Sequence, residues 1–118
     1  MRKMFALISV LVISAGLAMA QTHARARTFT GQIMDSACAA AGSHAAGYKM
    51  TGTHTPRACT LACVKAGSKF VLYNAAHKMI YKLDNQKKPR AFAGENVRIT
   101  GTYDAATKTI HVERIARR

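Results

Sequence analysis

One stretch decides the fold of this chain: TPRACTLACVKAG, residues 55–67. It carries the start and stop signals of a single short helix. Thr55 is a good N-cap, Pro56 suits the first helical position, and Gly67 suits the left-handed residue that follows a last turn. Because Cys59 and Cys63 are four residues apart, they share one face of this helix. Whatever joins these two sulfurs to the rest of the chain therefore helps to determine the fold.

On either side of this helix, five segments alternate in the manner of β-strands. They are residues 28–35, 69–73, 78–83, 96–103 and 108–115. In the first, Phe29, Gly31 and Ile33 share one face; in the fourth, Val97 and Ile99 share one face. The alternation predicts strands that bury one face and expose the other.

A glycine in the first strand and another in the fourth would let the strands bend at the corners of a small barrel. We therefore predict a mainly β (α+β) fold, a small five-stranded OB-like antiparallel barrel with one short helix inserted between strands 1 and 2. An open antiparallel sheet with the helix on one face is the alternative. The domain should occupy residues 28–115, with residues 21–27 as a flexible arm and residues 116–118 as a frayed tail.

The segment between the first strand and the helix is rich in small residues and carries His44 and His54. Its first residues, 37–41, are predicted to form a turn of helix, and the rest an exposed loop. A loop of this length in a small domain is typical of a tethered or functional segment. Asp35, at the end of the first strand, either caps the following turn or contributes a carboxylate to a site near Cys38. Capping is the commoner use of Asp in such a place.

The N-terminus has the pattern of a signal peptide. Arg2 and Lys3 are followed by an apolar run over residues 4–17 and by the small-x-small sequence AMA at residues 18–20. The apolar run is shorter than the about 20 residues that a membrane-spanning helix needs. We expect residues 1–20 to be removed, the mature protein to be periplasmic or extracellular, and no membrane span to remain.

Four groups of residues carry a resemblance to known proteins: GQIMDSAC at 31–38, CTLACVKAG at 59–67 with FVL at 70–72, YKLDN at 81–85, and AG at 93–94 with VRITG at 97–101. Together they resemble a family of short exported bacterial proteins of unknown function. The C…CxxxC cysteine pattern is the most specific part of the resemblance. The resemblance implies an OB-like fold and an exported location, and it supplies no activity.

Export places the three cysteines in an oxidising compartment, where a disulfide is the default. Cys59 and Cys63 on one helix are poorly placed to bond to each other. A bond from Cys38 to Cys59 or Cys63 would close a loop of about 20 residues and stabilise the fold by about 3 kcal/mol on the loop-entropy model. This reading predicts a small exported binding or structural domain with one thiol left over.

A metal site is the first alternative for the same sulfurs. Thiolates from Cys38, Cys59 and Cys63 with His44 or His54 would form a tetrahedral zinc set, and two thiolates with a nearby His or Met would suit Cu(I). The spacing matches no standard zinc motif.

A second metal site is conceivable at the new N-terminus. Cleavage after Ala20 would make His23 the third residue of the mature chain. An amine, two backbone amides and that imidazole bind Cu(II) or Ni(II) in a square plane. Short motifs of this kind also arise by chance.

Thiol redox chemistry is the remaining alternative. Cys59 falls in the first turn of the helix and close to Arg57, where the helix dipole and the positive charge favour a thiolate. The chain has no CxxC motif, which most thiol oxidoreductases carry.

The charge and the side-chain inventory bear on partners and on catalysis. The formal charge of +13 includes Arg2 and Lys3, so the mature chain carries +11. A net positive charge of this size attracts acidic partners. Export disfavours nucleic acid and favours an anionic cell-envelope polymer or surface, although the basic residues are spread along the chain.

No Ser/His/Asp set, phosphate loop or carboxylate pair is recognisable, so we expect binding and no enzyme activity.

Overall fold

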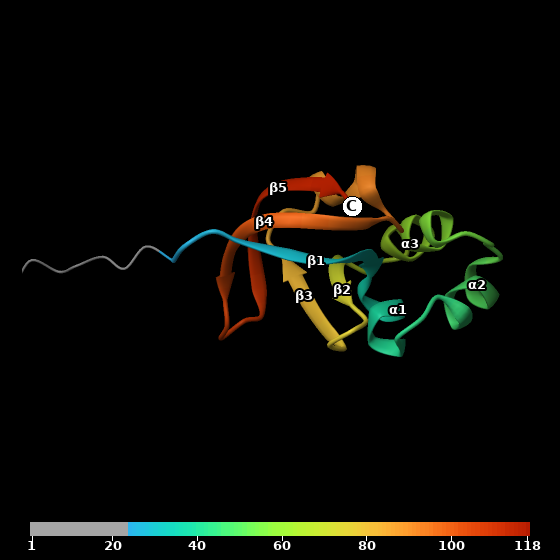
Figure 1. The fold of residues 1–118 in the computed structure, drawn as a ribbon. Helices are drawn as coiled ribbons and strands as arrows, with labels where there is room; N and C mark the ends of the chain where they lie inside the picture. Colours follow the sequence, from blue (N-terminus) through green and yellow to red (C-terminus); the bar gives the residue numbers. More distant parts are fainter. Residues whose placement is uncertain (1–23) are drawn as a thin grey trace, which may run out of the picture.

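The computed structural model describes residues 24–118. Its five strands are β1 (Arg27–Asp35), β2 (Phe70–Asn74), β3 (Met79–Leu83), β4 (Asn96–Asp104) and β5 (Thr109–Arg117). They hydrogen-bond in the closed order β1-β2-β3-β5-β4, so the sheet closes into a ring (Figure 1). The prediction of a mainly β fold with five strands is confirmed. One pair departs from the antiparallel expectation, because β3 and β5 run parallel.

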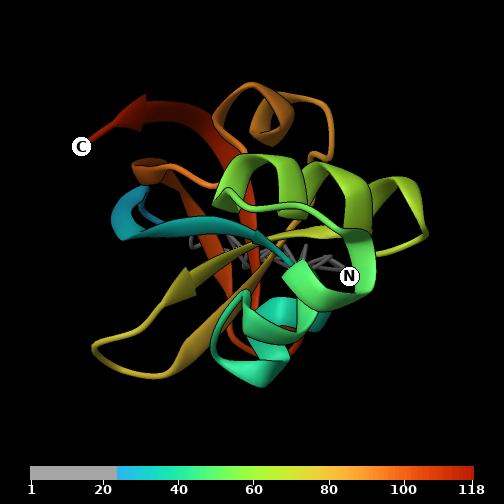
Figure 2. The ribbon, with the colours of Figure 1, turned by 90° about the vertical axis from the view of Figure 1, so that its right-hand side faces the viewer.

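Three helices, and not one, lie between β1 and β2. They are α1 (Ser36–Ala41), α2 (Ala45–Thr51) and α3 (Pro56–Lys65), and a short 3₁₀ helix η1 (Lys88–Phe92) precedes β4. The helices gather at the end of the ring where β1 finishes, and α3 crosses that end (Figures 1 and 2). No helix within residues 24–118 has the length and hydrophobicity to span a bilayer.

The prediction of an exposed loop after residue 41 is wrong, because this segment contains α2. Gly42 ends α1 and Gly52 ends α2, each in the left-handed conformation, with φ of 79° and 67°. Two glycine stops only ten residues apart leave room for a helix of two turns. A helix that short is marginal in isolation, so its packing against the rest of the domain stabilises it.

The predicted limits of α3 are confirmed. The Thr55 hydroxyl accepts a hydrogen bond from the Ala58 N–H at 3.1 Å. At the other end Gly67 has φ of +118°. The Gly67 N–H donates to Val64 O and the Ser68 N–H donates to Cys63 O, each at 3.0 Å. These two bonds form the Schellman stop that ends many helices.

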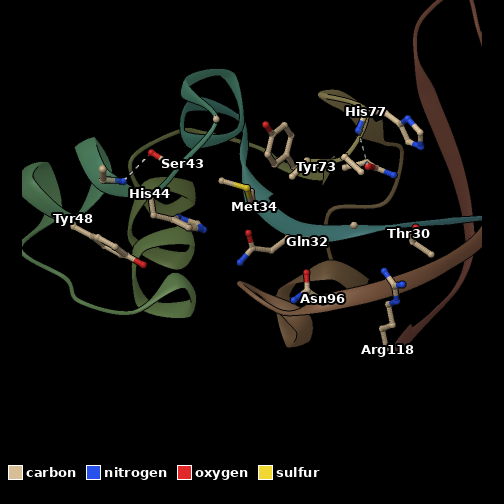
Figure 3. Close-up of a pocket in the computed structure, with 16 residues that line it drawn as sticks. Thr30, Gln32, Met34, Ser43, His44, Tyr48, Tyr73, His77, Asn96 and Arg118 are labelled. Carbon is tan, nitrogen blue, oxygen red and sulfur yellow. Dashed lines mark hydrogen bonds between the residues drawn. The ribbon is translucent and has the colours of Figure 1, made fainter.

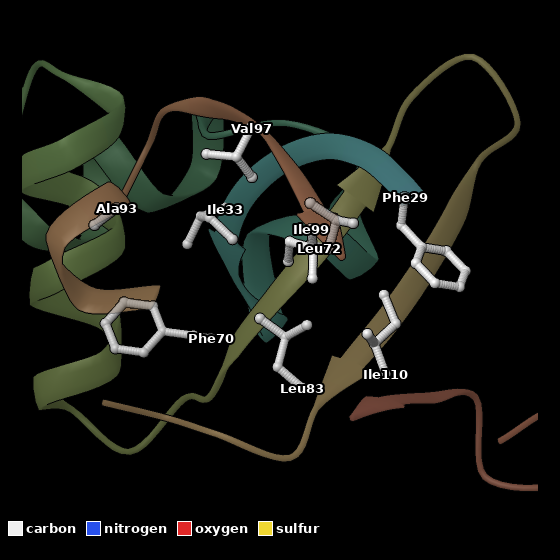
Figure 4. Packing of buried hydrophobic residues seen from close by; sticks show 9 residues of the cluster. All are labelled: Phe29, Ile33, Phe70, Leu72, Leu83, Ala93, Val97, Ile99 and Ile110. Atoms are coloured by element: carbon white, nitrogen blue, oxygen red, sulfur yellow. The ribbon is translucent and has the colours of Figure 1, made fainter. Parts of the chain in front are cut away.

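The core lies inside the ring. Nine buried side chains fill it: Phe29, Ile33, Phe70, Leu72, Leu83, Ala93, Val97, Ile99 and Ile110 (Figure 4). Leu61 and Val64 of α3 pack against this cluster and close one end. Full burial of each large side chain contributes about 1.5–3 kcal/mol. A second, smaller cluster lies outside the ring, between the strands and the helices, and it contains Met34, Val71 and the sulfur atoms discussed below.

The last residues of the chain are paired, where the sequence predicted a frayed tail. Strand β5 continues to Arg117, which lies opposite Val97 of β4. The Arg118 N–H then donates to Asn96 O at 3.1 Å. The Arg117 side chain binds Glu95 at 2.8 Å and lies over the Phe92 ring. Pairing with β4, which local sequence does not encode, extends the strand to its end.

Candidate metal centre

Three thiols and one carboxylate meet where β1, α1 and α3 come together. Asp35, Cys38, Cys59 and Cys63 each offer one ligand atom, and these four atoms all lie within 4.8 Å of one another. The Sγ atoms of Cys38 and Cys59 are 4.0 Å apart. All three cysteines are unbonded thiols in the structure. The two sulfurs of the helix face and the upstream Cys38 are therefore brought together, as the sequence predicted.

Asp35 caps the following helix and also lies beside the three sulfurs. It is the last residue of β1 and the N-cap of α1, where Asp35 Oδ2 accepts the Cys38 N–H at 3.0 Å. Its other oxygen, Oδ1, is buried and has no hydrogen-bond partner. A buried polar oxygen without a hydrogen-bond partner is costly. A cation at the sulfurs would supply the missing interaction.

Gly47 of α2 lies directly against the sulfurs. An ideal Cβ on this residue would stand 2.6 Å from Sγ of Cys38 and 2.6 Å from Sγ of Cys59. Any larger residue would occupy the space in which the thiols meet. The sequence offered no signal for this contact, because its pattern predicts an exposed loop around Gly47.

Burial and the charge of Asp35 keep the thiols of Cys38 and Cys63 protonated. Cys38 is only 4% exposed. Burial raises the pKa of the Cys38 thiol far above its ordinary range, and the hydrogen bond and charge of Asp35 raise it further. Burial, with Asp35 and Cys59, also raises the pKa of Cys63. Thiols in this state are poor nucleophiles, whereas a coordinated metal ion would deprotonate them.

The histidines predicted as metal ligands lie in different places. His44 is buried beside the centre, and both of its ring nitrogens lack a hydrogen-bond partner. Burial lowers the pKa of His44, although the negative charge of Asp35 acts in the opposite direction. His54 is exposed in the connection between α2 and α3 and is outside the cluster. His23 lies outside the described residues.

His44 also lines a cavity of about 790 Å³ on the outer side of β1. Its ring stacks on Tyr48, with 5.7 Å between the ring centroids. Figure 3 shows the imidazole pointing toward Gln32 and Met34, across the cavity from Asn96 and Arg118. His44 thus forms part of the wall of this cavity.

The redox alternative finds no support in the geometry. Cys59 is completely buried, so a substrate disulfide has no access to its sulfur. The Arg57 guanidinium donates to Ala91 O of η1 at 3.2 Å. It is therefore engaged away from the thiols that it was expected to activate.

Replacing Gly47 with alanine tests the close packing at the centre. Helix propensity alone would make Gly47→Ala stabilising by about 1 kcal/mol. Because both sulfurs must move to admit the methyl group, we expect a net loss of about 1–3 kcal/mol, measured by urea unfolding. Ala46→Gly, at an exposed position of the same helix, should cost only about 1 kcal/mol. A Gly47→Ala chain more stable than the wild type would contradict the packing described here.

Comparison with known proteins relates the C-terminal part of the chain to one family. Residues 64–118 match a family described as a protein of unknown function (DUF5818). The match begins in the second half of α3 and includes all strands except β1. Neither the curated proteins nor the solved structures contain a match to this chain.

Proposed function

We propose that this chain is a small exported OB-like domain that binds one zinc ion through Cys38, Cys59, Cys63 and Asp35. The observation that carries the proposal is the approach of these four ligand atoms to within 4.8 Å of one another. Three sulfurs and an oxygen are a ligand set that zinc accepts in tetrahedral geometry. The carboxylate favours zinc over Cu(I), which prefers sulfur ligands alone.

The spacing of the sulfurs favours a metal over a disulfide. In a tetrahedral zinc site with Zn–S bonds of about 2.3 Å, two sulfurs lie about 3.8 Å apart. The Cys38 and Cys59 sulfurs are separated by 4.0 Å. A disulfide would bring them to about 2.0 Å. Zinc therefore needs a much smaller rearrangement than a disulfide does.

The buried charges favour a divalent cation. Protonation keeps these thiols neutral without a metal, and once they ionise, the thiolates and the carboxylate repel one another unless a bound cation offsets that repulsion. The unpartnered Asp35 Oδ1 adds a polar atom that such an ion would satisfy.

The strand order supports the OB-like part of the proposal. An OB-fold is a five-stranded, partly open Greek-key barrel. Here the ring order β1-β2-β3-β5-β4 places β1 next to β4 and joins β3 to β5 in parallel. Export rests on the leader pattern of residues 1–20, which lie outside the described residues.

Native mass spectrometry with zinc titration tests the proposal. We expect one zinc ion per chain, and three alkylated cysteines after denaturation. Asp35→Asn keeps an oxygen that accepts the Cys38 N–H but loses the charge, so it should fold and bind zinc about 10–100-fold more weakly. A wild-type chain that binds no zinc when its thiols are reduced would refute the proposal.

A disulfide between Cys38 and Cys59 is the second candidate. The contact of their sulfurs at 4.0 Å favours this pair over others, and an oxidising compartment would promote it. Protein taken from its exporting compartment would then be two mass units lighter and show one alkylated cysteine. That result would favour a structural role for the cluster.

A further inference from the structure

The outer face of β1, β4 and β5 carries rows of polar and basic side chains. Cross-strand register places Thr30 opposite Arg98 and Arg98 opposite Ala116 in one row, and Thr28 opposite Thr100 and Thr100 opposite Arg114 in the next. Val97 and Ile99, the strand neighbours of Arg98, are fully buried, so Arg98 faces outward. The arginines of the two rows are exposed.

The two rows in the middle of this face carry a net positive charge. None of the residues in the two rows is acidic, and Arg98 and Arg114 line a shallow depression of about 340 Å³. Elsewhere in the chain, Asp35 is buried and Glu95 is engaged by Arg117. Glu113 precedes Arg114 in β5 but does not line the depression. An anionic ligand would therefore meet two guanidinium groups with little opposing charge.

The next row leads into the large cavity. Gln32 lies opposite Asn96, and the Arg118 N–H donates to Asn96 O. All three residues line the cavity of about 790 Å³. On the far side are Tyr73 of β2 and His44 (Figure 3). The polar rows and the cavity thus form one continuous surface.

His44 gives the cavity a buried polar side chain that has no hydrogen-bond partner. It is only 8% exposed, and neither ring nitrogen has a hydrogen-bond partner. A neutral imidazole offers one donor and one acceptor. Burying both without partners is costly, unless a ligand in the cavity satisfies them.

The chemistry of the surface selects the class of ligand. Guanidinium groups match carboxylates and sulfates with paired hydrogen bonds. Threonine hydroxyls and the Gln32 and Asn96 side chains suit sugar hydroxyls, and the cavity volume is in the range that accommodates small organic groups. The open rows carry no aromatic ring on which successive nucleobases would stack. We propose that this surface binds an acidic polysaccharide, with its anionic groups at Arg98 and Arg114 and one sugar in the cavity beside His44.

Binding to polygalacturonate and heparin, measured against neutral dextran and single-stranded DNA, tests the proposal. We expect both acidic polysaccharides to bind and dextran not to bind. In Arg98→Gln/Arg114→Gln the affinity should fall at least about 10-fold, and the plot of log K against log salt should become shallower by about 1–2. The control Lys49→Gln/Lys65→Gln removes the same charge from exposed positions on α2 and α3, and it should change the affinity less than 2-fold.

A second variant tests the cavity. His44→Phe keeps an aromatic ring against Tyr48 but removes both nitrogens, so we expect a several-fold loss of affinity with an unchanged salt slope. Equal losses in the two double variants, tighter binding of DNA than of polysaccharide, or an unaffected His44→Phe chain would each overturn the proposal. The arginine variants leave the sulfur cluster intact, so their zinc stoichiometry reports separately on the metal site.

Discussion

Replacing Cys59 with alanine should lower the affinity for zinc by at least about 100-fold. Cys59 is completely buried, and its sulfur lies 4.0 Å from that of Cys38 within the sulfur cluster. A structural zinc site binds its metal with about 10–16 kcal/mol shared among its ligands, so the loss of one ligand in four removes several kcal/mol. Alanine is preferred to serine here, because a buried serine hydroxyl would add its own cost of about 1–3 kcal/mol.

The measurement is competition with a chromophoric zinc chelator under reducing conditions. Thr60→Val is the matched control. Thr60 is the next residue of α3, it is equally buried, and its hydroxyl has no hydrogen-bond partner. The valine chain should therefore retain the wild-type affinity and be at least as stable. Wild-type zinc affinity in Cys59→Ala would show that the sulfurs do not hold the metal.

Replacing Gly94 with alanine should lower the free energy of unfolding by about 3–5 kcal/mol. Gly94 has φ of +77°, which costs an L-residue about 1–2 kcal/mol. A Cβ there would also stand 2.6 Å from the carbonyl carbon of Pro56 and overlap the Arg57 nitrogen. These are backbone atoms at the start of α3, so they cannot rotate out of the way. The Gly94 N–H also donates to Ile33 O at 2.8 Å, which ties this point to β1.

Urea unfolding of Gly94→Ala beside Gly52→Ala separates strain from overlap. Gly52 has φ of +67°, and no atom lies within 4 Å of its ideal Cβ. Its replacement should therefore cost only about 1–2 kcal/mol of conformational strain. Equal losses in the two chains would mean that α3 does not pack on Gly94 as closely as described. Because α3 carries two of the proposed ligands, Gly94→Ala should weaken zinc binding as well.

Local patterns in the sequence determined the elements whose signals lie within a few residues. The five strands follow from alternation, and α3 follows from Thr55, Pro56 and Gly67. The shared face of Cys59 and Cys63 follows from their spacing on that helix. These features are predictable because each depends on near neighbours in the chain.

Only the tertiary structure decided how distant segments meet. A two-turn helix such as α2 has too few local interactions to form alone, so nothing in the sequence predicted that Gly47 would lie on the sulfurs. The sequence left Asp35 between a cap and a site near Cys38, and only the folded structure places its carboxylate beside all three sulfurs. The tail at residues 116–118 is ordered by β4, a partner that its own sequence does not specify. The alternation of a strand and the start and stop signals of a helix depend on neighbouring residues. The candidate site instead depends on the closure of the ring and on the three helices at its end.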